Sequence, residues 1–482
     1  MSLRLEMVAH GLLALYLVAL LAVPRVPTTI AALACLVALA AARGRWRIEA
    51  RRSFRHMAVL VVPAAIYLLH LLLQIVFGMA SPQLANQLLI GMLTIALGLS
   101  DVPSRLPDLR RWILPAAALG AIASAVLAVY QVWGLGYLRP YGWLGGSAIG
   151  NGAIKFGDLA SLQALLSLVL VLTAAERPRR LLGLAGLFCG MLSLALTQTR
   201  GGLVGVLLAV GALGLALFLH RRRVQRAARG DGRAEAAGAT PVTVHAAHHG
   251  LRRGTSIGML AVALVLSLSA AGFMQDRFAA IEPQVQRYLH GDIDSEVGQR
   301  LALWGAALRA GMHQPLTGVG FGHFDDELER QVAAGEIPRS ERIIYGHPHS
   351  EYLAALAEAG VSGFLALLLM FVAPMVAMAR RIVVRGGSPA AYAALVTSAA
   401  FAGFALTDDM FDRQITVIAF YLLNAWFLRA AFRPALAEEP YRPPLEPRPA
   451  QQGAPESGPL AQAPLDPRRL EQPPPLDRSP LA

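Results

Sequence analysis

Long apolar runs recur along this chain, and each is long enough to cross a lipid bilayer as a helix. A hydrocarbon core of about 30 Å needs roughly 20 apolar residues in helical conformation. The chain is therefore expected to be an all-α integral membrane protein with about twelve transmembrane helices. The twelve runs lie at residues 7–23, 27–42, 57–79, 83–100, 112–134, 158–174, 181–198, 202–219, 255–274, 361–379, 390–407 and 415–432.

Arginine clusters between these runs predict the orientation of the chain in the membrane. The even-numbered connectors are basic, as at Arg43–Arg55, Arg177–Arg180, Arg221–Arg223 and Arg380–Arg385, whereas the short odd-numbered connectors carry at most two basic residues each. By the positive-inside rule, both termini face the cytoplasm and the odd connectors face outward. The net charge of +12 reflects this arrangement, so it does not indicate a nucleic-acid-binding protein.

One external connector is far longer than the others and divides the chain. Residues 275–358 are of mixed polarity and rich in Arg, His and Gly. We expect them to form an external catalytic loop with short helices. Residues 1–274 would hold the first nine membrane helices with a cytoplasmic loop at 220–254, and residues 359–432 the last three. The Pro-rich residues 433–482 are predicted to be a disordered cytoplasmic tail.

Charged groups are missing from the middle of the predicted spans and gather at their outer ends. Ion-coupled transporters usually keep such groups at mid-depth. The distribution therefore favours an outward-facing pocket at the membrane surface, with a polytopic transporter as the alternative from another class. The polar groups concerned are Arg139, Lys155, Arg200, Asp408, Asp409 and Arg413.

Two arginines stand out as candidate anion ligands. Arg200 is followed by two glycines, which would let a backbone or a headgroup approach closely. Arg300 opens a segment whose apolar stripe predicts an amphipathic helix. A guanidinium binds phosphate oxygens bidentately and keeps its charge. Interfacial anchoring of Arg200 and a surface position for Arg300 remain the structural alternatives. The stripe consists of Leu303, Ala306, Ala307 and Ala310.

His349 is the strongest candidate for proton transfer. An imidazole is the side chain best suited to accept a proton at ambient pH. The chain turns helical directly after His349, which would attract an anionic ligand. His347 lies two residues earlier and remains a second candidate. Metal binding by the His-x-His pair is the competing interpretation, and it is disfavoured because no acidic cluster is adjacent in the sequence.

The remaining polar groups have weaker signals. Arg139 and Lys155 could add positive charge to the same pocket or simply anchor their helices at the interface. Asp408 and Asp409 could pair with Arg413 or orient an arginine. The alternating glycines at residues 318–322 fit either a phosphate loop or a tight turn.

In their order and spacing, these segments resemble the O-antigen ligase and polymerase superfamily. The resemblance covers residues 197–363, and Ser350 stands where the family commonly has Asn. It implies an inverting glycosyl transfer at the periplasmic face of a Gram-negative inner membrane. The elements that carry it are Thr-x-x-Arg-Gly at 197–201, Arg-x-x-x-Trp at 300–304, Pro-Leu-x-Gly-x-Gly-x-Gly-x-Phe at 315–324, and His349, Ser350, Tyr352, Leu353, Glu358, Gly360 and Gly363.

The same resemblance implies substrates and residue roles. The donor would be O-antigen polysaccharide on undecaprenyl diphosphate, and the acceptor would be lipid A–core oligosaccharide. His349 would act as general base, while Arg200 and Arg300 would hold the diphosphate. Because of their charge at the same pocket, Arg139 and Lys155 are predicted as further diphosphate ligands. Neither a metal nor another cofactor would be required. Secondary candidates are His347, Tyr352, Asp408 and Asp409.

The residue chemistry fits this reaction on its own terms. A diphosphate leaving group is already anionic, so it needs cations and no general acid. A single displacement needs one base, whereas glycoside hydrolysis usually uses two carboxylates. An O-antigen polymerase, with a lipid-linked repeat unit as acceptor, and a ligase for protein acceptors remain the alternatives within the family.

Overall fold

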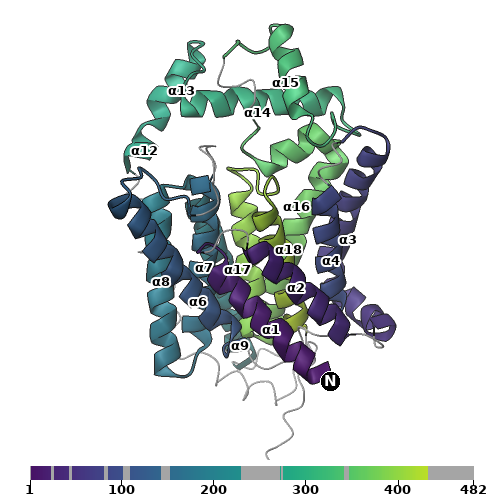
Figure 1. Ribbon diagram of the computed structural model, residues 1–482, viewed down its shortest axis with the longest axis vertical. Helices are drawn as coiled ribbons and strands as arrows, with labels where there is room; N and C mark the ends of the chain where they lie inside the picture. The colour runs from purple at the N-terminus through teal and green to yellow at the C-terminus, as the bar shows by residue number, and fades with distance from the viewer. Residues whose placement is uncertain are drawn as a thin grey trace, which may run out of the picture. The chain divides into compact units, whose positions relative to one another are not determined.

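The computed structural model of the protein describes residues 2–22, 26–42, 46–80, 85–100, 109–142, 152–228, 272, 275–340 and 347–432. Every regular element in this part of the chain is helical, as the predicted fold class requires (Figure 1). The elements are α1 (Ser2–Ala19), α2 (Val26–Ala41), α3 (Trp46–Val76), α4 (Ala85–Leu99), α6 (Ile113–Val129), η2 (Tyr130–Gly134), α7 (Gly152–Thr173), α8 (Arg177–Thr197), α9 (Arg200–Ala228), α12 (Gln275–Ala279), α13 (Ile281–Leu289), α14 (Glu296–His313), α15 (Phe324–Ala333), α16 (Glu351–Arg385), α17 (Pro389–Phe404) and α18 (Gln414–Ala431).

Eleven of the twelve predicted spans coincide with helices of the described part of the chain. Seven helices there are long and apolar enough to cross a membrane, and α2 and α17 are shorter apolar helices. The protein is therefore an α-helical membrane protein. The predicted span at 255–274 lies outside the described residues apart from Gly272, as do residues 229–254 and the tail at 433–482. Residues 220–228, predicted as the start of a loop, instead continue α9.

Small residues set the close packing at the centre of the bundle. α7 is almost entirely buried and contacts α6, α8, α9 and α17. α8 approaches it through a stripe of glycines, since a Cβ on Gly183 would lie 2.7 Å from Val171 and one on Gly190 2.7 Å from Ala164. Such stripes let membrane helices pack with their backbones close together.

The short helices α12, α13, α14 and α15 lie beyond one end of the membrane helices (Figure 1). Ser295 begins α14 by accepting a hydrogen bond from the backbone N–H of Gly298 at 3.0 Å. The predicted apolar stripe of α14 is confirmed, because all four of its side chains are buried, and Phe324 and Leu328 of α15 belong to the same small core. This core gives α14 a fixed place at that end of the bundle.

The glycine-rich segment forms a tight turn against α16. Helix α16 kinks at Gly360, where φ is 66°, and a Cβ there would lie 2.5 Å from the carbonyl oxygen of Pro315. The backbone N–H groups of Val319, Gly320 and Gly322 donate to oxygens of Ala357 and Glu358. These donors are already used within the protein, so the segment is not a phosphate loop.

Candidate active site

The segment that carries the two histidines is held from both sides. Trp304 of α14 donates from Nε1 to the carbonyl oxygen of Pro348 at 2.8 Å. On the other side, the backbone N–H of Glu351 donates to the carbonyl oxygen of Ala405 at 2.9 Å. Between these anchors His349 has a φ of 51°, a left-handed conformation that costs about 1–3 kcal/mol for a non-glycine residue. The anchors fix the imidazole in this strained position.

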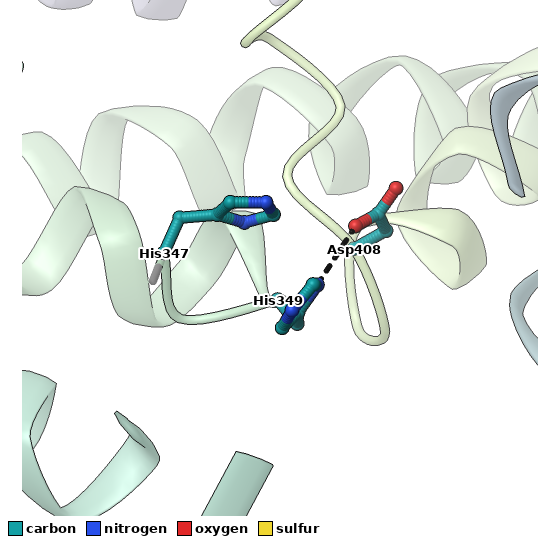
Figure 2. A group of neighbouring side chains, drawn as sticks. All are labelled: His347, His349 and Asp408. Carbon is teal, nitrogen blue, oxygen red and sulfur yellow. Dashed lines mark hydrogen bonds and ion pairs between the residues drawn. The ribbon is translucent and has the colours of Figure 1, made fainter. Parts of the chain in front are cut away.

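Two histidine–aspartate pairs lie next to each other at this point, and Figure 2 shows His349 with its partner Asp408 and the neighbouring His347. Nδ1 of His349 lies 3.4 Å from Oδ1 of Asp408, and Nδ1 of His347 lies 2.5 Å from Oδ2 of Asp409. The two rings are 4.2 Å apart between centroids. With Nδ1 directed at a carboxylate, His349 keeps Nε2 available to accept a proton. This is the arrangement in which a carboxylate orients a general base.

Lys155 holds the aspartates in place. Its buried ammonium lies 2.6 Å from Oδ2 of Asp408 and 3.1 Å from Oδ1 of Asp412, and it also donates to the carbonyl oxygen of Asp409. An ammonium has three donors, and these three contacts occupy them. The contacts favour a positioning role for Lys155 over the predicted role as a diphosphate ligand.

Charge interactions outweigh burial for two of these groups. Burial alone would raise the pKa of Asp408, but the charge of Lys155 and the hydrogen bonds from His349 and Lys155 hold that pKa below its usual range. Burial alone would lower the pKa of His347, but its hydrogen bond to Asp409 and the nearby aspartate charges raise it. Asp408 is therefore a carboxylate at neutral pH, and His347 carries more positive charge than a free histidine.

Three arginines line one pocket beside these pairs. The pocket is small, and Arg139, Arg200 and Arg300 provide the positive charge of its lining. Arg200 is the first residue of α9, so the backbone N–H groups of that helix end also favour an anion here. The lining residues are Arg139, Ile154, Gln198, Thr199, Arg200, Gly201, Glu296, Arg300 and Thr407.

Two of the arginines are fixed by backbone carbonyl groups. Nε of Arg139 donates to the carbonyl oxygen of Thr197 at 2.6 Å, and Nη1 of Arg300 donates to that of Thr407 at 3.1 Å. These bonds orient the two guanidinium groups at the pocket. Gly201 permits this packing, because a Cβ there would lie 2.3 Å from Oγ1 of Thr407. The pocket suits a ligand with several anionic oxygens.

The pocket and the histidine pairs share one loop. Thr407 accepts the hydrogen bond from Arg300, and the next residue, Asp408, contacts His349. Helix α14 provides a second link, since Arg300 lines the pocket and Trp304, one turn later, holds Pro348. The pocket lined by Arg139, Arg200 and Arg300 thus adjoins the loop that carries Asp408.

His347, His349 and Asp408 also form a group that is able to hold a metal ion. One ligand atom from each lies within 4.8 Å of the others. The sequence argument against a metal was that no acidic cluster lies next to the histidine pair, but the folded chain brings Asp408 to both histidines. Whether the group suits a metal ion therefore depends on the charge around Asp408. Lys155 already neutralises Asp408 at 2.6 Å, and a second cation on the same carboxylate would be repelled.

Of the secondary candidates, the two aspartates contact the histidines, whereas Tyr352 packs away from the pocket. Asp408 and Asp409 pair with the histidines and Lys155, and Arg413 contacts Asp412 instead, with 3.5 Å between Nε and Oδ2. Tyr352 donates its hydroxyl to the carbonyl oxygen of Ala402 at 3.1 Å and does not line the pocket.

Sequence reasoning missed several polar groups of the site. Glu351 is buried and accepts a hydrogen bond from the backbone N–H of Phe411 at 2.9 Å, and Glu296 lines the arginine pocket. Asp158 is fully buried, and neither of its carboxylate oxygens has a hydrogen-bond partner among the described residues. A carboxylate one turn after the chain's lone lysine was the available signal for Asp158.

Comparison with known proteins gives a family for the segment that contains this site. Residues 185–368 match a family model described as O-antigen ligase. This segment contains Arg200, Arg300 and both histidines, and the match supports membership of the O-antigen ligase superfamily. An uncharacterized protein of Haemophilus influenzae is 23% identical over 274 residues, which cover 56% of this chain and 60% of that protein. The chain thus spans about 60% of the length of that relative.

Proposed function

We propose that the protein is an inverting glycosyltransferase of the bacterial inner membrane. It transfers O-antigen polysaccharide from undecaprenyl diphosphate to a sugar hydroxyl of lipid A–core oligosaccharide. The observation that carries the proposal is the convergence of three arginines on one pocket beside the His349–Asp408 pair. The arginine distribution of the connectors supports a periplasmic position for this site.

The arginines supply the electrostatic part of the reaction. Arg200 and Arg300, with Arg139 beside them, bind the diphosphate and stabilise the charge that develops on it as the glycosidic carbon–oxygen bond breaks. Removing one such donor typically lowers a rate by about 10²–10³. The leaving group departs as undecaprenyl diphosphate and needs no protonation.

The histidine supplies the base. Nε2 of His349 accepts the proton of the acceptor hydroxyl while its oxygen forms the new bond to the anomeric carbon. Asp408 holds the ring and stabilises the imidazolium that forms, with Lys155 fixing Asp408. Attack from the face opposite the diphosphate inverts the anomeric configuration. Asp408 is thus a positioning residue for the base.

The test is glycan transfer by purified protein, with polyprenyl-diphosphate-linked polysaccharide, lipid A–core and a chelator. We expect His349→Ala to lower the rate by about 10²–10⁴ and Arg200→Ala or Arg300→Ala by about 10²–10³. His323→Ala is the matched control, because His323 forms an exposed pair with Asp326 at 2.8 Å in the same loop segment. Wild-type transfer by the His349 variant would refute the assignment.

Analysis of a deletion strain separates ligation from polymerisation. A missing ligase leaves long lipid-linked polymer without capped lipopolysaccharide, whereas a missing polymerase leaves single lipid-linked repeat units. Accumulation of single lipid-linked repeat units would indicate that the protein is the polymerase. Uptake of a solute by reconstituted protein without any glycan transfer would favour a transporter.

A further inference from the structure

A second cluster of basic side chains lies at the far end of α16 from His349. Arg381 and Arg385 come from the last turns of α16, and His56 comes from α3. The ring of Phe432, just after α18, stacks on His56 with centroids 4.9 Å apart, and the guanidinium of Arg381 lies 5.8 Å from the same ring. Arg429 of α18 is close enough to act electrostatically on His56, as are Arg381 and Arg385.

One donor of this cluster lacks an acceptor in the part of the chain that the structure describes. Nε of Arg381 is buried there and has no hydrogen-bond partner. Arg429, by contrast, donates from Nε to the carbonyl oxygen of Ser100 at 2.9 Å. A buried guanidinium N–H without an acceptor is costly, and native proteins almost always satisfy such groups. The orphan donor indicates that an acceptor outside the described chain belongs here.

We propose that Arg381, Arg385 and His56 bind the phosphate group of an anionic membrane lipid. Guanidinium groups match phosphate oxygens bidentately, and two adjacent arginines double the charge-assisted contacts. The cluster lies at the end of a membrane-spanning helix, which is the depth of lipid headgroups. The ring of Phe432 contacts both His56 and the guanidinium of Arg381, so it holds the two polar groups near each other.

This lipid site is separate from the candidate active site. Arg381 follows Glu351 by thirty residues of α16, and a helix rises about 1.5 Å per residue. Even with the kink at Gly360, the two ends of α16 are tens of ångströms apart. Failure of the glycosyltransferase proposal would therefore leave the lipid proposal standing, and the reverse is also true.

The experiment measures lipid binding to the full-length protein by native mass spectrometry. Phosphatidylglycerol is the anionic probe, phosphatidylcholine the zwitterionic control and inorganic phosphate the free-anion control. The test variant is Arg381→Gln/Arg385→Gln. The matched control is Arg222→Gln/Arg226→Gln, which removes two exposed charges from the end of α9; His220 of that helix lies 3.1 Å from the carbonyl oxygen of Val383. Both double variants lower the net charge equally.

We expect the test variant to weaken phosphatidylglycerol binding by about tenfold or more, the effect of losing one charge-assisted hydrogen bond. The control should stay within about twofold, and both should keep glycan transfer. Equal weakening in both variants, or equal binding of the two lipids by wild type, would overturn the proposal. If wild type bound inorganic phosphate at this site but not phosphatidylglycerol, the site would bind phosphate, and the proposal that its ligand is a lipid would be wrong. Arg385→Gln, at an exposed position, provides the same test if the double variant misfolds.

Discussion

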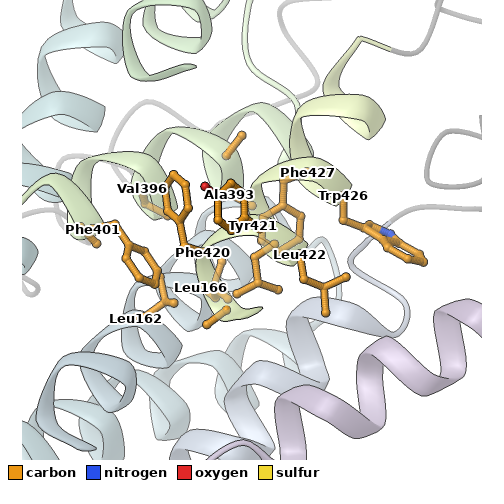
Figure 3. Close-up of a cluster of buried hydrophobic side chains, with 14 of the residues drawn as sticks. Leu162, Leu166, Ala393, Val396, Phe401, Phe420, Tyr421, Leu422, Trp426 and Phe427 are labelled. Atoms are coloured by element: carbon orange, nitrogen blue, oxygen red, sulfur yellow. The ribbon is translucent and has the colours of Figure 1, made fainter. Parts of the chain in front are cut away.

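The middle of the bundle buries apolar side chains, whereas its end near His349 buries charged ones. In the middle, α7, α17 and α18 bring together apolar side chains such as Leu166, Phe401, Phe420 and Phe427 (Figure 3). At the end, the same three helices and their connector bury Lys155, Asp158, Asp408 and Asp409. Apolar packing is set by shape and volume, whereas buried charges must find particular partners. The charged end therefore specifies one arrangement of the loop at 405–413.

This difference predicts different responses to substitution. Apolar cores accept volume-conserving changes at a cost usually below about 1.5 kcal/mol. Removing one partner of a buried ion pair strongly lowers the free energy of unfolding, because the other charge remains buried without a counter-charge. The charged end should therefore depend on individual residues far more than the middle does.

The largest effect is expected for Lys155→Met. This change keeps the length of the side chain but leaves Asp408 and Asp412 without their shared cation. Loss of one partner of a buried pair costs about 3–5 kcal/mol. The free energy of unfolding in detergent should fall by that amount, and glycan transfer should fall with it because the loop no longer holds His349.

A double variant tests whether the lost stability comes from the unpaired charge of Asp408. Lys155→Met/Asp408→Asn removes charge from both sides of the pair, so it should recover a large part of the lost stability while transfer stays low. Equal unfolding free energies for Lys155→Met and wild type would show that the ammonium does not hold the loop.

The sequence predicted the helical bundle well because hydrophobic length is a local property. The run at 361–379, for example, falls within α16, and the run at 415–432 ends one residue beyond α18. The stripe from Leu303 to Ala310 is buried as its period predicts. These features need no knowledge of distant residues, since each helix displays its own pattern of side chains.

The pairing inside the site was not predictable in the same way. Asp408 follows His349 by 59 positions, and no periodicity relates them. The sequence suggested a nearby partner, Arg413, for the two aspartates, but the loop turns so that Arg413 contacts Asp412. Lys155 was expected among the phosphate ligands because its charge is visible in the sequence, whereas its burial among three aspartates arises from the packing of α7 against α17.

A smaller effect is expected from the pH dependence of the His347–Asp409 pair. The pKa of His347 is raised in the folded protein above the ordinary 6.5. The stability contributed by the pair is therefore fully present below about pH 6.5, and it is lost as the pH rises through the higher folded-state pKa. Unfolding measured from pH 5.5 to 8.5 should show this decline in wild type, and His347→Gln should flatten it.

The control for this titration is His323→Gln, which removes an exposed histidine of the same loop segment. Its stability should decline with pH as in wild type. A His347→Gln profile that matches wild type would mean that Asp409 does not hold the proton on the histidine.

The smallest effect is expected for Tyr352, which lies where the charged end near His349 meets the apolar middle of the bundle. Tyr352 follows His349 by three positions, yet its ring packs near Phe371 with centroids 5.9 Å apart, and its hydroxyl bonds the carbonyl oxygen of Ala402. Tyr352→Phe should therefore lower the free energy of unfolding by about 1 kcal/mol and leave glycan transfer within about twofold. A large loss of transfer with unchanged stability would place this hydroxyl in the reaction, and the charged region would then extend further along α16 than its contacts indicate.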